Sequence, residues 1–222
     1  MSKPLGAKGS SIKVVLVGPS NAGKTSIAKR FTTDQFDEFQ DMTVGSAFFS
    51  KQVQSVTHQT SVRVEVWDTA GQEKYRAMAP MYFRNAAGAI LVFDLSTPSS
   101  FDDIEKVWLP ELLPHMKNST QFVVLCGNKC DTVNMNDAVT GQLVTKVKAM
   151  CASRNILYFN TSAKTGTGVT EVFTHLVDDI VDFRLKEAAT GLGTAQKSDK
   201  SLQPVSVSAP EKTAEKKESC CK

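Results

Sequence analysis

The amino-acid sequence predicts an α/β fold, in which helices cover both faces of a mostly parallel sheet. Short apolar runs alternate along the chain with stretches of helical periodicity, and polar motifs follow directly after several of the runs. Strands that alternate with helices favour right-handed crossovers and a parallel sheet, which binds ligands at the carboxyl ends of its strands.

Five segments have the pattern of β-strands. Residues 12–17 form a β-branched run, and residues 62–67 alternate apolar with charged side chains, as a half-buried strand does. Residues 89–93 and 122–126 are apolar throughout, which is typical of strands covered on both faces. The fifth run spans residues 156–159.

Helical periodicity fills the stretches between these runs. The predicted helices cover residues 24–31, 101–117, 138–153 and 168–186. In the last of them, apolar side chains three and four positions apart predict one face packed against the sheet. We expect one domain over residues 12–186, since 222 residues are too few for two ordinary domains.

The two ends of the chain differ from this domain. Residues 1–11 are predicted to be a flexible extension. Residues 187–222 contain no aromatic side chain and are rich in small and charged residues, so we expect a disordered tail.

Composition excludes several classes of protein. The chain is 41% hydrophobic and 22% charged, as in ordinary soluble proteins, and a net charge of +3 gives no reason to expect nucleic-acid binding. The apolar stretch 86–93 is too short to cross a membrane, and the polar start with Ser2 predicts neither a secretory signal nor myristoylation. Five cysteines without a repeated Cys-x-x-Cys pair predict neither zinc nor a disulfide framework.

Residues 18–25 read GPSNAGKT and fit the phosphate-loop pattern G-x-x-x-x-G-K-[ST], between a predicted strand and a predicted helix. The backbone N–H groups of such a loop and the start of the helix favour phosphate. Lys24 would reach the β and γ phosphates, and the Thr25 hydroxyl would bind Mg²⁺. The alternative is a glycine-rich turn with a surface lysine. The predicted phosphate contacts are Ser20, Asn21, Ala22, Gly23, Lys24, Thr25 and Ser26.

A second motif, Asn-Lys-Cys-Asp at residues 128–131, follows the predicted strand 122–126. The carboxylate of Asp131 can accept from the N1–H and the exocyclic amine of guanine, whereas adenine would leave a buried carboxylate unpaired. In isolation this motif is more often a solvated turn. Its position after a phosphate loop and before Ser-Ala-Lys, whose backbone N–H could meet guanine O6, favours a base site. The predicted base contacts are Asn128, Lys129, Asp131, Ser162, Ala163 and Lys164.

A third motif begins where the predicted strand 62–67 ends. Asp68 could hold Mg²⁺ through water, Gly71 lets a backbone N–H approach the terminal phosphate, and Gln72 could orient the attacking water. The alternative is that Asp68 or Thr69 caps a helix.

Together these motifs resemble the Ras superfamily of small GTPases over residues 12–186. The resemblance implies a P-loop NTPase G domain with a six-stranded sheet, which binds GTP or GDP with Mg²⁺ and hydrolyses GTP slowly without an activating protein. It implies that Thr25, Thr43 and Asp68 serve the metal and that Thr43 senses the γ-phosphate. It also implies that Phe36 lies beside the base and that Gln72 is the catalytic residue. These roles are those of the corresponding residues in Ras.

Within the superfamily, residues 67–73 (WDTAGQE) and the double cysteine near the C-terminus are similar to the Rab branch. Residues 35–40, 43–48 and 79–84 are similar to the early-endosomal, Rab-five-like members. The resemblance implies that effectors read an aromatic triad of Phe48, Trp67 and Tyr82. The alternative is that these aromatic side chains belong to the core.

Two positions depart from the pattern. Ser20 stands where Ras proteins have glycine, which leaves the rate of unaided hydrolysis open. The ending Cys220-Cys221-Lys222 is not C-a-a-X, so the resemblance implies paired geranylgeranylation, with two free thiols as the alternative.

The resemblance therefore implies a monomeric switch that recruits effectors to membranes in vesicular traffic, on the endocytic, early-endosomal route. The implied partners are a nucleotide exchange factor, a GTPase-activating protein, a GDP-dissociation inhibitor, a prenylation escort protein and membrane-tethering effectors. The implied location is the cytoplasmic face of endomembranes, in exchange with the cytosol. A kinase would need an insertion that the chain lacks, and a GTP-binding module without turnover is the remaining alternative.

Overall fold

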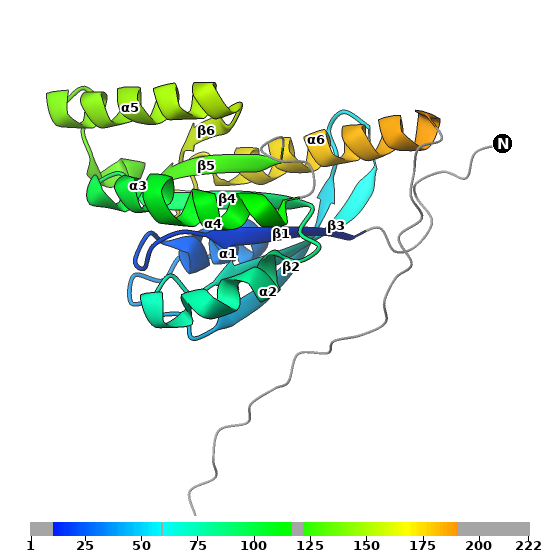
Figure 1. Cartoon of the computed structure of the whole chain (residues 1–222), viewed down its shortest axis with the longest axis horizontal. Helices are drawn as coiled ribbons and strands as arrows, with labels where there is room; N and C mark the ends of the chain where they lie inside the picture. The colour runs from blue at the N-terminus through cyan, green and yellow to red at the C-terminus, as the bar shows by residue number, and fades with distance from the viewer. Residues whose placement is uncertain (1–10, 59, 117–121, 191–222) are drawn as a thin grey trace, which may run out of the picture.

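A six-stranded sheet forms the centre of the structure, a computed structural model that describes residues 11–58, 60–116 and 122–190 (Figure 1). The strand order is β2-β3-β1-β4-β5-β6, and every neighbouring pair except β2 with β3 is parallel. Residues 191–222 of the predicted tail, with the predicted lipidation site, lie outside the described residues, as do residues 1–10 of the predicted extension. The predicted boundaries are wrong at both ends of the domain, because residues 187–190 continue α6 and Ser11 begins β1.

The strands confirm the five runs predicted from the sequence and add a sixth. Their bounds are Ser11–Val17 (β1), Ser46–Gln54 (β2), Ser61–Thr69 (β3), Gly88–Asp94 (β4), Val123–Asn128 (β5) and Leu157–Asn160 (β6). No hydrophobic run predicted β2, although the family resemblance implied six strands. As an edge strand, β2 alternates partly buried with exposed positions and carries few apolar side chains.

Helices cover both faces of the sheet, as predicted. The α-helices are Lys24–Thr33 (α1), Ala79–Phe83 (α2), Ser99–Asp103 (α3), Leu109–Leu112 (α4), Ala138–Arg154 (α5) and Val169–Thr190 (α6). Side chains of α1 and α6 belong to one core cluster, and those of α2, α3, α4 and α5 belong to the other. The rings of Phe31 and Phe173 stack between α1 and α6, with centroids 3.7 Å apart.

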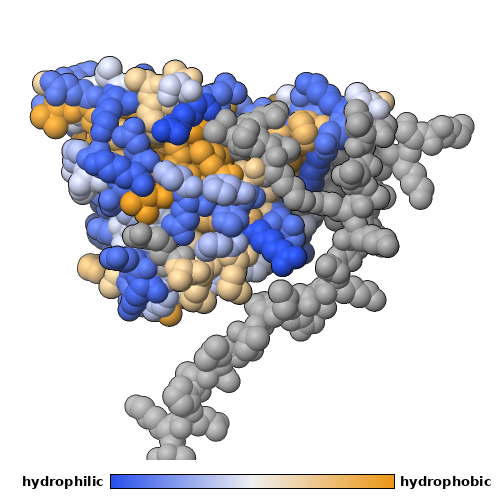
Figure 2. All heavy atoms as spheres, in the orientation of Figure 1, coloured by the Kyte–Doolittle hydropathy of each residue, from blue (hydrophilic) through white to orange (hydrophobic). Residues whose placement is uncertain are grey.

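The surface between α5 and α4 is less polar than the rest of the visible face. Figure 2 shows hydrophobic atoms gathered there, whereas hydrophilic atoms cover most of the outer side of α5. No helix in the described part of the chain is both long enough and apolar enough to span a bilayer.

The prediction of one regular helix over residues 101–117 is wrong, because the segment changes its helical type several times. The chain begins the segment at Ser99 with α3, continues as a π-helical turn over Ile104–Trp108, forms α4, and ends in a 3₁₀ turn over Leu113–His115. The cause is proline: Pro110 and Pro114 have no N–H to donate to the carbonyl four residues back, so the α-helical pattern cannot continue.

Candidate active site

The loop between β1 and α1 folds tightly against the neighbouring strand. Gly18 and Gly23 both have positive φ angles, of 147° and 88°. A Cβ at Gly18 would lie 2.1 Å from the carbonyl oxygen of Val92, and one at Gly23 would lie 2.4 Å from Nδ2 of Asn128. Only glycine fits either position, because an L side chain would meet both strain and a clash.

Lys24, the first residue of α1, places its ammonium group inside this loop. The side chain is buried, and Nζ donates hydrogen bonds of 2.8 Å to the carbonyl oxygens of Gly18 and Pro19. Burial lowers the pKa of Lys24 to about 8, although the nearby charge of Asp68 favours the ammonium form. The loop therefore holds a poorly solvated cation, and an anion would stabilise its charged form.

Three oxygen-bearing side chains converge beside Lys24 from α1, β3 and the loop before β2. The hydroxyls of Thr25 and Thr43 donate to Oδ2 of Asp68 at 2.6 and 3.1 Å, and their oxygens are 2.7 Å apart. Burial raises the pKa of Asp68, while hydrogen bonds from the two threonines and the charge of Lys24 oppose the rise. Within the described ranges, the buried Oδ1 of Asp68 has no hydrogen-bond partner.

This cluster fits a bound Mg²⁺. Mg²⁺ prefers oxygen ligands, keeps several of its waters and is held by one or two carboxylates, hydroxyls and phosphates. The orphaned Oδ1 of Asp68 can accept a hydrogen bond from such a water, which would remove the cost of a buried acceptor left unpaired.

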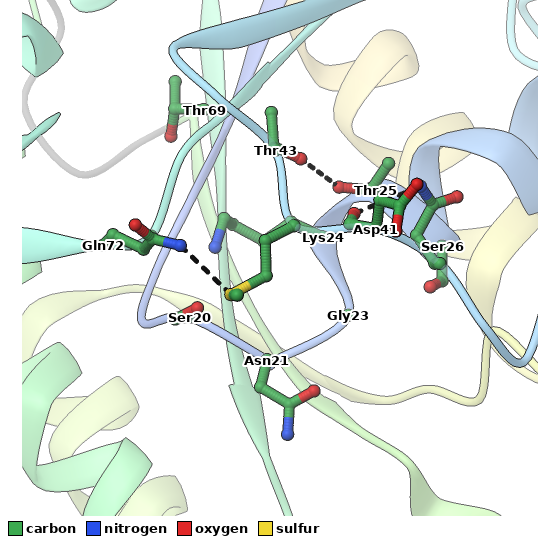
Figure 3. A pocket seen from close by; sticks show the side chains of 13 residues that line it. Ser20, Asn21, Gly23, Lys24, Thr25, Ser26, Asp41, Thr43, Thr69 and Gln72 are labelled. Carbon is green, nitrogen blue, oxygen red and sulfur yellow. Dashed lines mark hydrogen bonds between the residues drawn. The ribbon is translucent and has the colours of Figure 1, made fainter.

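One pocket joins the phosphate loop to the segments around Thr43 and Gln72 (Figure 3). The sequence-predicted site residues that line it are Ser20, Asn21, Gly23, Lys24, Thr25, Ser26, Thr43, Gly71 and Gln72. Ala22 and Asp68 are buried next to it rather than in its wall. The wall also contains four residues that the motifs did not predict: Gln40, Asp41, Met42 and Thr69. The signal for the first three was their position directly before Thr43.

Gly71 and Gln72 form the wall opposite α1. A Cβ at Gly71 would lie 2.5 Å from Nζ of Lys24 and 2.5 Å from the backbone N of Ser20, so the Gly71 backbone packs directly on the phosphate loop. The side chain of Gln72 crosses the pocket mouth, where Nε2 donates to the sulfur of Met42 at 3.0 Å (Figure 3).

Asn128, at the end of β5, connects the phosphate loop to the segment after β6. The side chain is 1% exposed; Nδ2 donates to the carbonyl oxygen of Ala22 at 2.9 Å, and Oδ1 accepts from the N–H of Ala163 at 3.2 Å. The next residue, Lys129, forms an ion pair of 2.7 Å with Asp94 at the end of β4. These contacts join the carboxyl ends of three strands to the phosphate loop.

The remaining base-site residues flank Asn128. Ser162 and Ala163 are buried, whereas Lys164 is exposed, and Phe36 packs against the α1–α6 core cluster. Asp131 is exposed on a short 3₁₀ turn, Cys130–Thr132, where its carboxylate is accessible to a ligand. The base-site residues do not line the pocket of Figure 3, which covers the phosphate side only.

Phe48, Trp67 and Tyr82 lie together at the surface where β2, β3 and α2 meet. The ring centroids of Phe48 and Trp67 are 5.4 Å apart, and those of Trp67 and Tyr82 are 6.3 Å apart. Phe48 is 45% exposed, and the other two side chains are partly exposed. The three aromatics are therefore accessible together rather than enclosed in the core.

The fold and the site define a P-loop nucleotide-binding domain, and comparison with known proteins identifies its family. The sequence model of the Ras family matches residues 13–182. The chain is 39% identical to Ras-related protein RABF2a of Arabidopsis thaliana over 188 residues, which cover 84% of this chain and 90% of that protein. It is 42% identical to GTP-binding protein ypt5 of Schizosaccharomyces pombe over 162 residues, 73% of this chain and 74% of that one.

A third relative, Ras-related protein Rab5A of Oryza sativa, is 40% identical over 168 residues, 76% of this chain and 79% of that protein. This chain belongs to the Ras family. Within the family, these relatives confirm the predicted similarity to the early-endosomal, Rab-five-like branch.

Proposed function

We propose that this chain is a GTP-binding and GTP-hydrolysing switch that recruits effectors to membranes on the endocytic route. As a member of the Ras family it uses GTP and GDP with Mg²⁺. The observation that carries the proposal is the convergence of Lys24 with the Thr25–Asp68–Thr43 cluster at the carboxyl ends of the strands.

The phosphate loop binds the nucleotide's phosphates. Backbone N–H groups around Ser20 to Lys24 donate to the phosphate oxygens, and the start of α1 contributes favourable positive potential. Among the described residues, the ammonium of Lys24 donates to two loop carbonyls and forms no ion pair, so it can turn toward the β and γ phosphates without breaking one.

Thr25, Thr43 and Asp68 hold the metal. The hydroxyl oxygens of both threonines would be ligands, and the unpaired Oδ1 of Asp68 would accept from a water of the ion. Mg²⁺, when bound, neutralises charge on the phosphate oxygens.

Gln72 orients the attacking water. Its amide reaches the pocket from the wall opposite α1, beside Gly71, whose N–H serves the terminal phosphate. Loss of that phosphate removes the contacts of Thr43 and Gly71, so residues 37–49 and 71–81 relax. An effector that binds the triad of Phe48, Trp67 and Tyr82 then dissociates.

The base lies beyond the pocket, toward Asn128. Asp131 reads the N1–H and the 2-amino group of guanine, and the N–H of Ala163 meets the 6-oxo group. Lys129 and Phe36 flank the ring, and Ser162 and Lys164 complete the segment that carries Ala163.

The deciding experiment measures uptake of GDP and ADP by the purified protein with Mg²⁺ and follows phosphate release in a single turnover of GTP. We expect the protein to bind GDP tightly, not to bind ADP, and to release phosphate from GTP slowly. Gln72→Leu should slow the release by ~10²-fold, because orientation of the water is lost, with GDP affinity retained. Equal uptake of ADP, or an unchanged rate in Gln72→Leu, would contradict the proposal.

We further propose that the protein attaches to the cytoplasmic face of early-endosomal membranes. Two lipid chains hold a protein on a bilayer, whereas one gives reversible attachment. Paired lipidation of Cys220 and Cys221 would meet this need and would require an escort protein and a GDP-dissociation inhibitor, beside the exchange factor, activating protein and tethering effectors.

The double variant Cys220→Ser with Cys221→Ser tests this attachment in cells. We expect it to move from the membrane pellet to the soluble fraction while it binds GDP normally. A variant that still pellets with membranes would refute the lipid anchor.

A further inference from the structure

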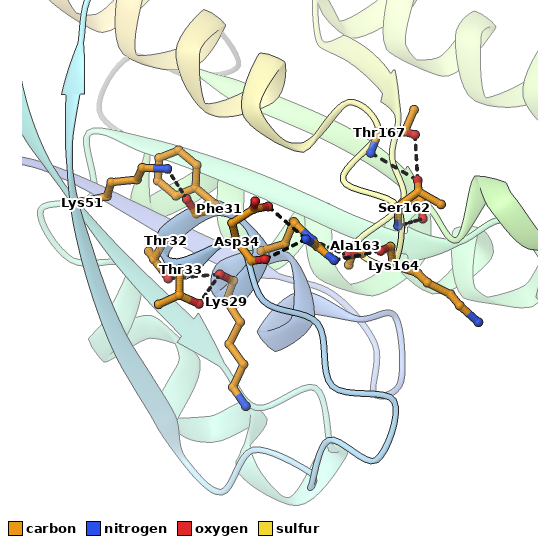
Figure 4. A network of polar contacts seen from close by, with 12 residues as sticks. Lys29, Phe31, Thr32, Thr33, Asp34, Lys51, Ser162, Ala163, Lys164 and Thr167 are labelled. Carbon is orange, nitrogen blue, oxygen red and sulfur yellow. Dashed lines mark hydrogen bonds and ion pairs between the residues drawn. The ribbon is translucent and has the colours of Figure 1, made fainter.

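Arg30, on the last turn of α1, belongs to none of the motifs, yet its guanidinium makes four hydrogen bonds. Nε donates to the carbonyl oxygen of Ala163 at 2.8 Å, and Nη2 donates to that of Lys164 at 2.8 Å. Nη1 donates to the backbone oxygen of Asp34 at 2.8 Å and to its carboxylate at 2.9 Å. Figure 4 shows these contacts between the end of α1 and the segment that carries Ala163.

The burial and the geometry of the Arg30 side chain favour strong hydrogen bonds. The Arg30 side chain is only 17% exposed, so water competes little for its donors. A planar guanidinium that donates to two successive carbonyls restricts their orientation as well as their position. Lysine, a point charge, cannot reproduce that restraint.

The segment that carries Ala163 is thereby held from two sides. Arg30 holds the carbonyls of Ala163 and Lys164, while Asn128 accepts the N–H of Ala163 at 3.2 Å. The contact with Asn128 is long for an N–H···O hydrogen bond, which leaves this N–H able to turn toward a better acceptor. Arg30 fixes the two peptide units that follow this N–H, so the rotation about the Ala163 N–Cα bond by which the N–H turns occurs against a fixed neighbour.

Arg30 also reaches the start of the loop that carries Phe36. Asp34 ends α1 in a left-handed conformation with φ of 56°, and the chain leaves the helix there. A second contact between the same two regions, Lys164 with Glu38 at 3.4 Å, is exposed at both side chains and contributes little. Arg30 is therefore the main polar connection that the described residues provide between the two segments.

We propose that Arg30 is a positioning residue for guanine recognition, which orients the backbone of Ala163 so that its N–H meets the 6-oxo group. Arg30 does not touch the base and acts through Ala163 and Lys164. This inference rests on the proposed function, because it assumes that guanine occupies the site.

Two analogues of GDP separate this role from a merely structural one. The diphosphate of 6-thioguanosine differs from GDP only at position 6, where sulfur is a larger and weaker acceptor. Inosine diphosphate differs only in lacking the 2-amino group, which Asp131 reads. Competition binding of both against GDP therefore measures the two recognition contacts independently.

Arg30→Ala in the full chain should lower the preference for GDP over 6-thio-GDP by about two- to tenfold, the effect of one hydrogen bond. The preference for GDP over inosine diphosphate should stay unchanged. GDP should also dissociate about tenfold faster, because hydrogen bonds from a charged group are lost. Arg30→Lys should lie between the wild type and Arg30→Ala.

Lys29→Ala is the matched control, because it removes the neighbouring cation of α1. The Lys29 side chain points away from Ala163 and Lys164 (Figure 4). Glu38→Ala, which removes only the exposed ion pair, is a second control. Both variants should keep the two base preferences of the wild type.

If Arg30→Ala lowered the affinities for GDP, 6-thio-GDP and inosine diphosphate by the same factor, the inference would be overturned. A merely structural role lowers affinity without regard to the base. Unchanged binding would overturn it as well. If Arg30→Ala is recovered unfolded, the preference of Arg30→Lys for GDP over 6-thio-GDP decides in the same way. A wild type that binds no GDP would instead refute the proposed function.

Discussion

At the scale of single residues, Lys24 links nucleotide binding to pH. Its pKa in the free protein is lowered to about 8, chiefly by burial. Bound phosphates add negative charge beside the ammonium and raise that pKa again. Above pH 8 the complex therefore holds more protons than the free protein, so nucleotide affinity falls as the pH rises through this range.

Calorimetry of GDP binding in two buffers with different ionisation enthalpies measures this effect directly. We expect almost no proton uptake from Lys24 at pH 7, where the ammonium is already charged, and an uptake approaching one proton per GDP near pH 9. Lys24→Met, studied at higher protein concentration, should show no such rise. The same uptake in this variant would assign the proton to another group.

Met42 is a second residue with a consequence for the chemistry. Its sulfur accepts a hydrogen bond of 3.0 Å from Nε2 of Gln72, the one such bond of that side chain among the described residues, although Met42 itself is 69% exposed. A Gln72 amide turned toward sulfur is not turned toward a water. In the proposed mechanism, this contact would keep the Gln72 amide from orienting the attacking water.

Met42→Leu keeps the size of the side chain and removes the acceptor. We expect unaided GTP hydrolysis to rise about two- to tenfold, as the loss of one weak hydrogen bond allows, with GDP affinity unchanged. Single-turnover phosphate release measures the rate. Hydrolysis no faster than in the wild type would show that the contact does not restrain Gln72.

At the scale of elements, hydrophobic runs predicted five strands, including β6 at one edge of the sheet, and missed β2 at the other edge. β4 is buried at every position and β5 likewise, so their sequences are continuously apolar. β2 has one neighbour and alternates partly buried with exposed side chains. The position of β2 is determined by its backbone pairing with β3, and a hydrophobicity pattern cannot predict such pairing. The irregular helix around Pro110 was predictable from its prolines alone.

The carboxylate of Asp178 on α6 fastens the turn between β2 and β3 by two hydrogen bonds, and Asp182 contacts His58 of the same turn at 3.5 Å. Oδ1 of Asp178 accepts from the hydroxyl of Ser55 at 2.6 Å and from the N–H of Val56 at 3.0 Å, and Ser55 is fully buried. This contact connects the edge of the sheet to the helix that leads toward the C-terminus.

Asp178→Ala should lower the free energy of unfolding by about 1–3 kcal/mol, because the buried hydroxyl loses a charged acceptor. Urea denaturation with GDP and Mg²⁺ present measures the loss. Asp179→Ala is the control, since the one partner of Asp179 in the described part of the chain is the exposed His175 at 3.1 Å and a surface pair contributes about 0–1 kcal/mol. Equal losses in the two variants would mean that the turn is not held by Asp178.

At the scale of the whole molecule, topology explains why the candidate site could be located from sequence. Lys24, Asp68 and Asn128 are far apart in the chain and come together because β1, β3 and β5 are parallel and end at the same edge. The motifs therefore predicted which residues meet. They could not predict Met42 or Arg30, because neither residue belongs to a motif and both act through contacts that only the folded chain creates.

Asn128 makes the two ends of the nucleotide interdependent. Because the Asn128 amide donates to the carbonyl of Ala22 and accepts from the hydroxyl of Thr161 at 3.3 Å, ordering the loop that binds pyrophosphate also orders the segment that faces guanine. A guanosine and a pyrophosphate supplied as separate molecules would each bind more tightly in the other's presence. Their joint affinity would thus exceed the product of the two alone, and the surplus would measure how rigidly that one side chain transmits order across the protein.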